Sequence, residues 1–180
     1  MNRPAALLLA ALPWLAGCPI PQPLAEVSKT AGTVTPPRIL VEAASAAGVV
    51  GTADGVVPYD TACPGGPQFT IGATVIDDNT EEVATARWFV DYDPAGGSAA
   101  SPVLTEDLSP PSVQPLNRRP VAPYVFKPVP FGAGPHLVEL VVSNGFGPIS
   151  ASPPYRAPAH NYEVQVFRWI FVEKSDGRCD

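Results

Sequence analysis

The chain has 180 residues, among them 24 prolines, with a formal net charge of −6 and 46% hydrophobic residues. This length fits one domain with a substantial core and is too short for two large domains. The proline content argues against long helices, and an acidic chain without a basic cluster argues against a nucleic-acid partner.

The N-terminus has the layout of an exported protein. Arg3 supplies a short positive region, and the apolar run over residues 5–15 is too short to span a bilayer as a helix. The run fits the hydrophobic region of a signal peptide, which is removed after export. Residues 15–18 read Leu-Ala-Gly-Cys, and this motif resembles the lipobox of bacterial lipoproteins.

The resemblance implies that residues 1–17 are a signal peptide and that Cys18 is lipidated after cleavage. Lipoproteins of this kind carry three acyl chains (palmitate-type) in many Gram-negative bacteria, and two or more chains hold a protein stably on a membrane. Pro19 follows the cysteine instead of the aspartate that favours inner-membrane retention, so the outer membrane is the expected location. The alternatives are an ordinary signal peptide with an incidental Cys18, and a cytosolic N-terminal helix.

Two cysteines remain if Cys18 is acylated. Export places Cys63 and Cys179 in an oxidising compartment, which favours a disulfide bond between them. The bond would close a loop of 117 residues (63 through 179), for which the chain-entropy model gives about 4–5 kcal/mol. The alternative is two free thiols.

Composition divides the mature chain into a tether and a domain. Residues 18–37 contain the anchor and a proline-rich stretch, which predicts a partly polyproline II tether that holds residues 38–180 off the membrane.

Within 38–180, apolar and polar residues alternate in short segments, which predicts half-buried strands. These segments are 38–43, 69–75, 86–92, 124–127, 137–143 and 162–173. The ranges 48–67, 94–123 and 144–159 are rich in proline and glycine and predict loops, with at most short irregular strands in 94–123. In the last segment the apolar parity changes after Val166, which predicts either a bulge or a strand that is apolar on both faces.

The pattern predicts an all-β fold, a single antiparallel immunoglobulin-like β-sandwich of about seven strands with long proline-rich loops. Residues 134–144 resemble the late strand of PKD-type and other immunoglobulin-like modules, with His136 in place of the usual aromatic residue. The positions that match are Gly134, Val138, Leu140, Val142 and Asn144. Residues 87–91, Arg-Trp-Phe-Val-Asp, resemble the strand that carries the core tryptophan, whereas the inter-sheet cysteine pair of antibody domains is absent.

The sequence contains no nucleophile elbow, phosphate loop, dinucleotide fingerprint or zinc-ligand spacing. We therefore predict no catalytic residue, no cofactor and no metal. His136 is expected at a sheet edge and His160 in a loop. The pair Arg118-Arg119 is expected on the solvated surface.

Acidic residues gather at the ends of two strands. Asp77-Asp78-Asn79 follows one strand, and Asp91 and Asp93 follow the next. If the two strands are adjacent and joined by a hairpin, these two groups lie at opposite ends of the sheet, so ordinary turn chemistry is favoured over a shared calcium ion.

The aromatic residues provide the remaining candidates. Trp88 is expected in the core. Phe89 has the parity opposite to Trp88, and Trp169 has the parity opposite to Val164, so both are candidates for a ligand or partner surface. The alternative is that the long loops cover them. The leading hypothesis is a lipid-anchored, non-enzymatic envelope module that binds or braces a protein or glycan. The alternatives are a carbohydrate-binding or adhesive module with exposed aromatic residues, and a hydrolase with a dispersed site.

Overall fold

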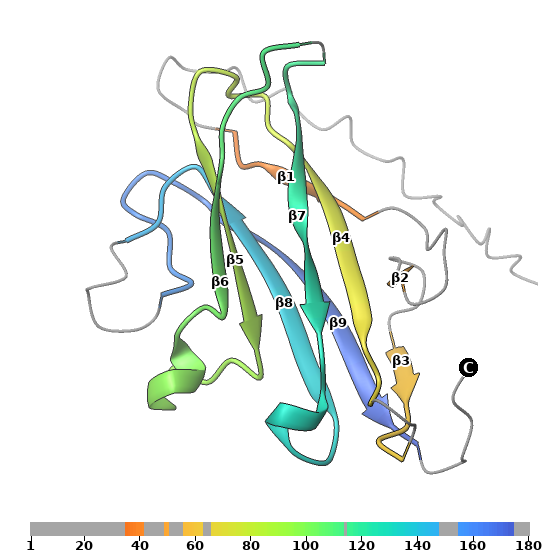
Figure 1. Cartoon of the computed structure of the whole chain (residues 1–180). Coiled ribbons are helices and arrows are strands. Elements are labelled where there is room, and N and C mark those ends of the chain that lie inside the picture. The colour runs from red at the N-terminus through yellow and green to blue at the C-terminus, as the bar shows by residue number, and fades with distance from the viewer. Residues whose placement is uncertain are drawn as a thin grey trace, which may run out of the picture. The chain divides into compact units, whose positions relative to one another are not determined.

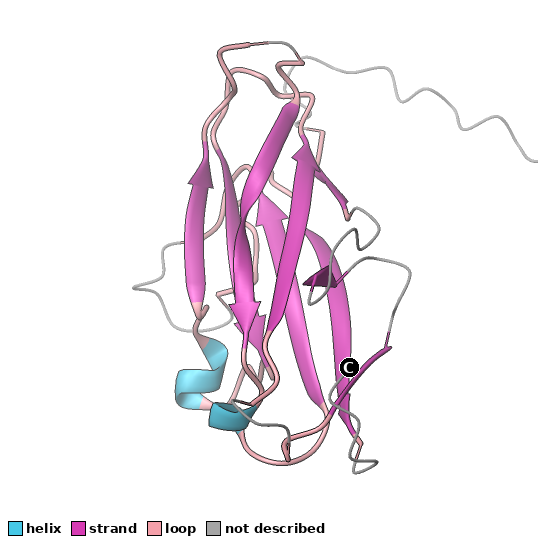
Figure 2. Cartoon of the chain, turned by 45° about the vertical axis from the view of Figure 1, so that its right-hand side comes forward, coloured by secondary structure: helices cyan, strands magenta, loops and turns pink. Residues whose placement is uncertain are grey.

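The strands of this protein form two β-sheets that pack face to face (Figures 1 and 2). The computed structural model describes residues 35–41, 49–50, 56–62, 66–113, 115–147 and 155–174. All of these belong to one compact unit, Thr33–Asp180. The described residues contain no α-helix, only the short 3₁₀ turns η2 (Gly97–Ala100) and η3 (Val129–Phe131), and hence no helix that could cross a membrane.

Sheet A has β4 at its centre. Its strands are β1 (Arg38–Leu40), β2 (Val49–Val50), β4 (Phe69–Ile76) and β7 (Arg118–Phe126). On one side β4 pairs antiparallel with β7, and on the other it pairs antiparallel with β1 and parallel with β2. The β4–β7 register shifts between Ile71 and Ala73, which marks a bulge opposite Gly72.

Sheet B has the strand order β3-β9-β8-β5-β6. Its strands are β3 (Val56–Tyr59), β5 (Ala84–Val90), β6 (Leu104–Leu108), β8 (His136–Ser143) and β9 (Gln165–Glu173). Only the β3–β9 pair is parallel. The N-terminal segment therefore contributes to both sheets, with β1 and β2 in sheet A and β3 in sheet B.

The core lies between the sheets because every second residue of each long strand points inward. Trp88 of β5 is fully buried, which confirms its predicted core position. Its ring stacks on Trp169 of β9 at 5.6 Å and on Tyr124 of β7 at 5.3 Å between centroids. Tyr124 belongs to sheet A, so one aromatic stack joins the two layers.

The structure confirms the strands expected at 69–75, 86–92 and 137–143 as β4, β5 and β8, with boundaries that differ by one or two residues. Two of the expected loops contain strands. The range 48–67 holds β2 and β3, and the range 94–123 holds β6 and most of β7. Prolines obscured these strands, yet Pro58 and Pro120 lie in edge strands, where a missing amide hydrogen is tolerated.

The parity change after Val166 does not come from a bulge. The β8–β9 register runs unbroken from Val142↔Gln165 to His136↔Phe171. Strand β9 is instead largely apolar on both faces, since Phe171 is buried in the core while Ile170 lies outward at 42% exposure. The second of the two predicted alternatives is therefore confirmed.

Candidate functional site

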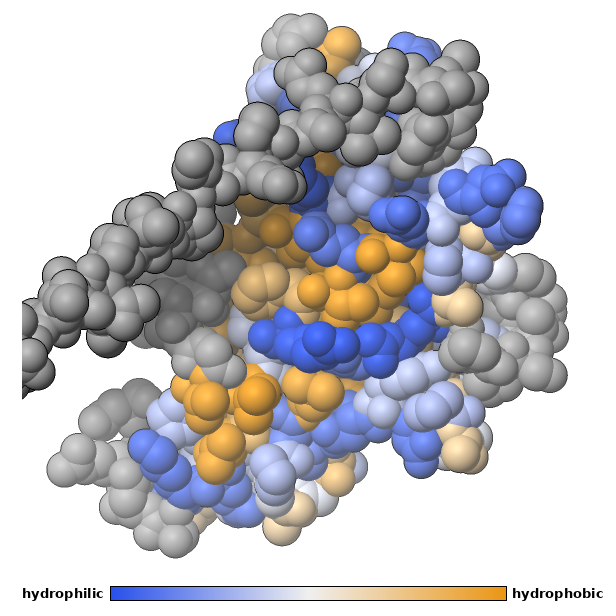
Figure 3. All heavy atoms as spheres, turned by 180° about the vertical axis from the view of Figure 1, so that it is seen from behind, coloured by the Kyte–Doolittle hydropathy of each residue, from blue (hydrophilic) through white to orange (hydrophobic). Residues whose placement is uncertain are grey.

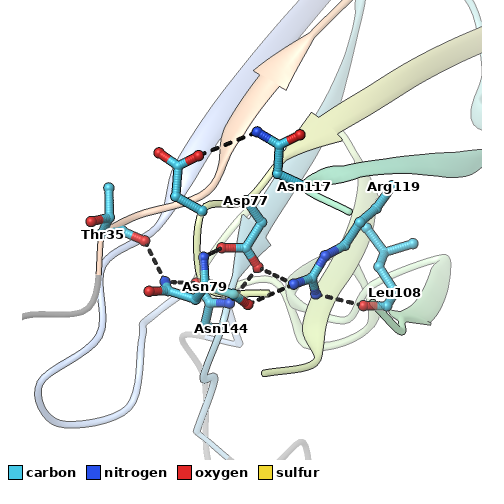
Figure 4. A network of polar contacts seen from close by, with 8 residues as sticks. Thr35, Asp77, Asn79, Leu108, Asn117, Arg119 and Asn144 are labelled. Carbon is cyan, nitrogen blue, oxygen red and sulfur yellow. Dashed lines mark hydrogen bonds and ion pairs between the residues drawn. The ribbon is translucent and has the colours of Figure 1, made fainter. Parts of the chain in front are cut away.

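A buried ion pair of sheet A lies at the end of the domain where the chain enters β1, and its hydrogen bonds reach residues of sheet B (Figure 4). Arg119 on β7 lies with Nη2 2.8 Å from Oδ2 of Asp77, and the two side chains are 1% and 0% exposed. Arg119 also donates hydrogen bonds to the carbonyl oxygens of Leu108 and Asn79, both at 2.8 Å. Because Leu108 ends β6, one guanidinium connects β6, β7 and the turn after β4.

Two asparagines complete this group. The backbone N–H of Asn79 donates to Oδ1 of Asp77 at 2.9 Å, and Nδ2 of Asn144 donates to Oδ2 at 2.7 Å. Both carboxylate oxygens of Asp77 are therefore satisfied, as a buried charge requires. We call the four residues Asp77, Asn79, Arg119 and Asn144 the polar hub.

The polar hub also holds the N-terminal segment. Nδ2 of Asn79 donates to the carbonyl oxygen of Thr35 at 2.8 Å (Figure 4), and Pro37 is buried. Residues 35–37, the last three of the predicted tether, are thus in contact with the domain.

The expectation of a solvated Arg118-Arg119 pair is wrong for Arg119. Residues alternate along β7, so that Arg118 lies outward and exposed while Arg119 lies inward, opposite Val75. A desolvated guanidinium needs a carboxylate partner, and Asp77 supplies it. The turn role expected for Asp77 is present as well, in its bond to the Asn79 amide.

A second pair, with a buried histidine and an exposed aspartate, lies at the opposite end of sheet B. His136, 4% exposed, has Nδ1 2.7 Å from Oδ2 of Asp91, whose Oδ1 accepts from the Leu137 amide at 2.7 Å. Asp91 has φ +50°, which is uncommon for a residue other than glycine, and these two bonds hold it there. The expected edge position of His136 is wrong, because β8 lies between β9 and β5. Asp77 contacts Asn144 after β8 and Asp91 contacts His136 at the start of β8, so the two are separated as expected, but the predicted hairpin is wrong because β4 and β5 lie in different sheets.

Tyr59 packs against this pair. Its ring stacks on His136 at 6.1 Å between centroids, and its hydroxyl donates to the carbonyl oxygen of Gly134. Burial raises the pKa of Tyr59, and the carboxylates of Glu173 and Asp91 raise it further.

Part of the outer face of sheet B is covered by residues 144–147 and 155–162, which we call the clasp. Arg87 on β5 donates to the carbonyl oxygen of Tyr155 at 2.6 Å and to that of Gly147 at 3.3 Å. Its guanidinium lies 4.1 Å from the ring centroid of Phe146. Burial lowers the pKa of Arg87, and Asp107 opposes this shift. The Arg87 side chain of β5 thereby holds the backbone of the clasp against sheet B.

The clasp binds back through Arg156. Its guanidinium lies 4.6 Å from the ring centroid of Tyr92 and forms a 3.2 Å ion pair with Glu139 on β8. Glu139 is 1% exposed and also accepts from Nε of Arg168 at 2.7 Å. The Glu139–Arg168 pair lies in register between the apolar pairs Val141–Val166 and Leu137–Ile170. On the back of the molecule, a hydrophilic band likewise lies between hydrophobic groups (Figure 3).

The two aromatic residues predicted as a ligand or partner surface are both buried. Phe89 and Trp169 are each 0% exposed. Trp169 points into the core, because the inward set of β9 is Phe167, Trp169 and Phe171. Phe89 points outward from sheet B, but it packs edge-on against Tyr92, over which Arg156 of the clasp lies. Phe89 is thus buried against Tyr92, and Arg156 of the proline-rich loop lies over the Tyr92 ring.

The predicted lipidation site Cys18 and the predicted disulfide pair Cys63–Cys179 lie outside the described residues, as do the signal peptide and residues 18–34 of the tether. The described neighbours of the disulfide pair lie side by side. The hydroxyl of Thr61 donates to Oε1 of Glu173 at 2.7 Å, and the Lys174 amide donates to the carbonyl oxygen of Tyr59 at 2.7 Å. Strands β3 and β9 run parallel, so Thr61 and Lys174, which follow them, lie at the same end of the strand pair.

The chemistry of these clusters is structural. Among the described residues, no group of three or more histidines, cysteines and carboxylates could hold a metal ion. The hydrogen-bonding positions of the His136–Asp91 pair are taken by backbone groups of Leu137 and Gly132. Sequence reasoning missed the polar hub and the clasp, although the inward parity of Arg119 would have revealed the hub once β7 was recognised as a strand.

Comparison with known proteins adds no relative: no family model, no curated protein and no solved structure matches this chain.

Proposed function

We propose that this chain is a lipid-anchored cell-envelope protein whose two-sheet domain is a non-enzymatic binding or structural module. Lipid on Cys18 would hold it at the outer membrane of a Gram-negative bacterium, and the tether would present the domain to an envelope protein or glycan. The proposal rests on the N-terminal motif and on how the domain uses its buried charges.

The observation that carries the non-enzymatic role is the use of the buried ionisable side chains. A catalytic acid or base has to reach a substrate, whereas each of these side chains bonds to another part of the described fold. They are Asp60, Asp77, Arg87, Arg119, His136 and Glu139. Such bonds favour a rigid scaffold over a reaction centre.

The position of the polar hub supports anchoring through the N-terminus. Asn79 holds Thr35, so the free tether is residues 18–34, which reach about 53 Å when fully extended at about 3.1 Å per residue. A force applied through the tether would act on the polar hub, which contacts both sheets. The force would therefore be borne by more of the fold than the three-residue strand β1.

We also propose that the domain is immunoglobulin-like. The strand order supports this, since the N-terminal segment contributes to both sheets and Trp88 fills the core from a central strand of sheet B. The parallel pairing of β3 with the last strand, β9, fits the same topology. Function does not follow from this assignment, because such sandwiches serve many roles.

Phe89 and Trp169 do not support the carbohydrate-binding alternative, because neither side chain is exposed. A glycan remains a candidate partner only through other residues.

Metabolic labelling with a palmitate analogue tests the anchor. We expect the full-length chain to incorporate label, the Cys18→Ser variant to carry none and to keep residues 1–17, and the matched control Cys63→Ser to be labelled like the wild type. An unlabelled wild type, or label that persists in Cys18→Ser, would contradict the proposal.

A further inference from the structure

The outer face of sheet A combines exposed apolar residues with arginines that form no ion pair in the described part of the fold. The β4 register places Leu40, Thr74 and Pro120 in one outward row and Thr70 and Val125 in another. Leu40 and Val125 are each 42% exposed, and Gly72 between the rows opens onto free space. No described segment lies in front of β4 and β7 in the view of Figure 1.

Its charges are all positive. Arg38 on β1 and Arg118 on β7 flank Ile76 in one row across three strands. Both arginines are exposed, and neither has an ion-pair partner among the described residues. The chain contains 17 acidic residues, yet none of the outward positions in the described β1, β4 and β7 is acidic.

Parts of the other surfaces are occupied by contacts within the described fold. The clasp covers part of sheet B, and Glu139 is paired there with Arg156 of the clasp and Arg168 of β9. At the side where the edge strands β6 and β7 meet, Glu106 accepts the Ala122 amide at 2.9 Å and Arg119 donates to the Leu108 carbonyl oxygen. Exposed apolar residues beside unpaired arginines, without carboxylates, are typical of protein interfaces.

We propose that the outer face of sheet A is the docking surface for a protein partner that presents carboxylates to Arg38 and Arg118 and apolar side chains to Leu40 and Val125. The inference rests on the proposed binding role and names its surface. Because Arg38 and Arg118 lie on the two strands that flank β4, their Cα atoms are about 10 Å apart, which sets the spacing of the partner's carboxylates.

Charge complementarity selects a protein over the other occupants. Sugar-binding faces use exposed aromatic rings, and the described outward residues of sheet A include none. An anionic membrane would be repelled by the net negative chain, and Asp78 and Glu81 are exposed at the same end as Arg118. Binding of a second copy of this chain would appear in the experiment as an adduct between two copies.

Photo-crosslinking in cells that make the full-length chain tests the surface. Benzoylphenylalanine replaces Thr74 on the outer face of sheet A or, as the matched control, Thr105, an exposed residue on the outer face of sheet B. We expect Thr74→benzoylphenylalanine alone to give a discrete protein adduct whose cross-linked peptide contains Asp or Glu. Arg38→Glu with Arg118→Glu should lower the yield at least tenfold, whereas Arg38→Lys with Arg118→Lys should keep most of it.

The inference is overturned by no adduct at Thr74, by an adduct that charge reversal leaves unchanged, by an adduct to a second copy or to glycan, or by an adduct at Thr105 alone. Tryptophan fluorescence of each variant verifies that the domain is folded. Palmitate labelling of the same cells reports on Cys18 separately, so failure of the anchor and failure of this surface are distinguishable.

Discussion

Removing Arg119 is the sharpest perturbation of the fold. Arg119→Ala leaves the Asp77 carboxylate at 0% exposure without its counter-charge and removes the donors to the carbonyl oxygens of Leu108 and Asn79. Breaking a buried ion pair in this way costs about 3–5 kcal/mol. Asp77 keeps its bonds from Asn79 and Asn144, so we expect the lower half of that range, about 3–4 kcal/mol.

The chain supplies its own control. Arg118 is the preceding residue but is exposed and makes no ion pair in the described part of the fold, so Arg118→Ala should change stability by less than about 0.5 kcal/mol. The double variant Asp77→Ala with Arg119→Ala removes both charges and should be less destabilised than the sum of the single variants, by at least about 1 kcal/mol.

Urea unfolding of mature chain that carries Cys18→Ser measures these changes. Of the three tryptophans, Trp14 is in the predicted signal peptide, and Trp88 and Trp169 are fully buried, so their fluorescence reports on the core. Equal midpoints for Arg119→Ala and Arg118→Ala, or strict additivity in the double variant, would refute the buried ion pair.

Three further predictions concern other parts of the domain. Gly145→Ala should destabilise the domain by about 1–3 kcal/mol, because an added Cβ would lie 2.7 Å from Cε2 of the Tyr162 ring, whereas Gly147→Ala meets nothing within 4 Å and should be neutral in the same urea assay. The raised pKa of Tyr59 means that the folded state holds its phenolic proton more tightly, so this contribution to stability is complete below about pH 10 and is lost as the pH rises through the folded pKa. In alkaline unfolding curves, Tyr59→Phe should lose less stability with rising pH than the wild type. An unchanged slope would refute the assignment. Peptide mapping without reduction should recover Cys63 linked to Cys179, whereas two separate thiol peptides would exclude the bond.

Local alternation predicted the strands whose residues follow it. In β4 and β8 the inward positions are apolar, as in Ile71, Val75 and Leu140, and both strands appear where expected. The end of β7 was predicted as the strand at 124–127, but residues 118–123 were missed because Pro120 and Pro123 suggested a loop, although an edge strand accommodates proline. With this first part of β7 missed, the inward position of Arg119 and its pairing with Asp77 could not be inferred.

The cover over Phe89 could not be predicted for a different reason. Its parity correctly places it outward from sheet B, where it packs against Tyr92, and the ring of Tyr92 is in turn covered by Arg156 of the clasp, a segment more than 50 residues further along the chain. The Arg87 contacts to Tyr155 and Gly147 that fix the clasp follow no sequence period. Patterns with periods of two residues determine which face a side chain occupies, whereas non-local packing determines what covers that face.

The chemical state of Cys18 tests the central claim most directly. Mass spectrometry of the N-terminal peptide from membrane-purified protein should find a chain that begins at Cys18 and carries a diacylglyceryl group on sulfur and a fatty acyl group on nitrogen. A chain that begins at another residue, or an unmodified Cys18, would contradict the account.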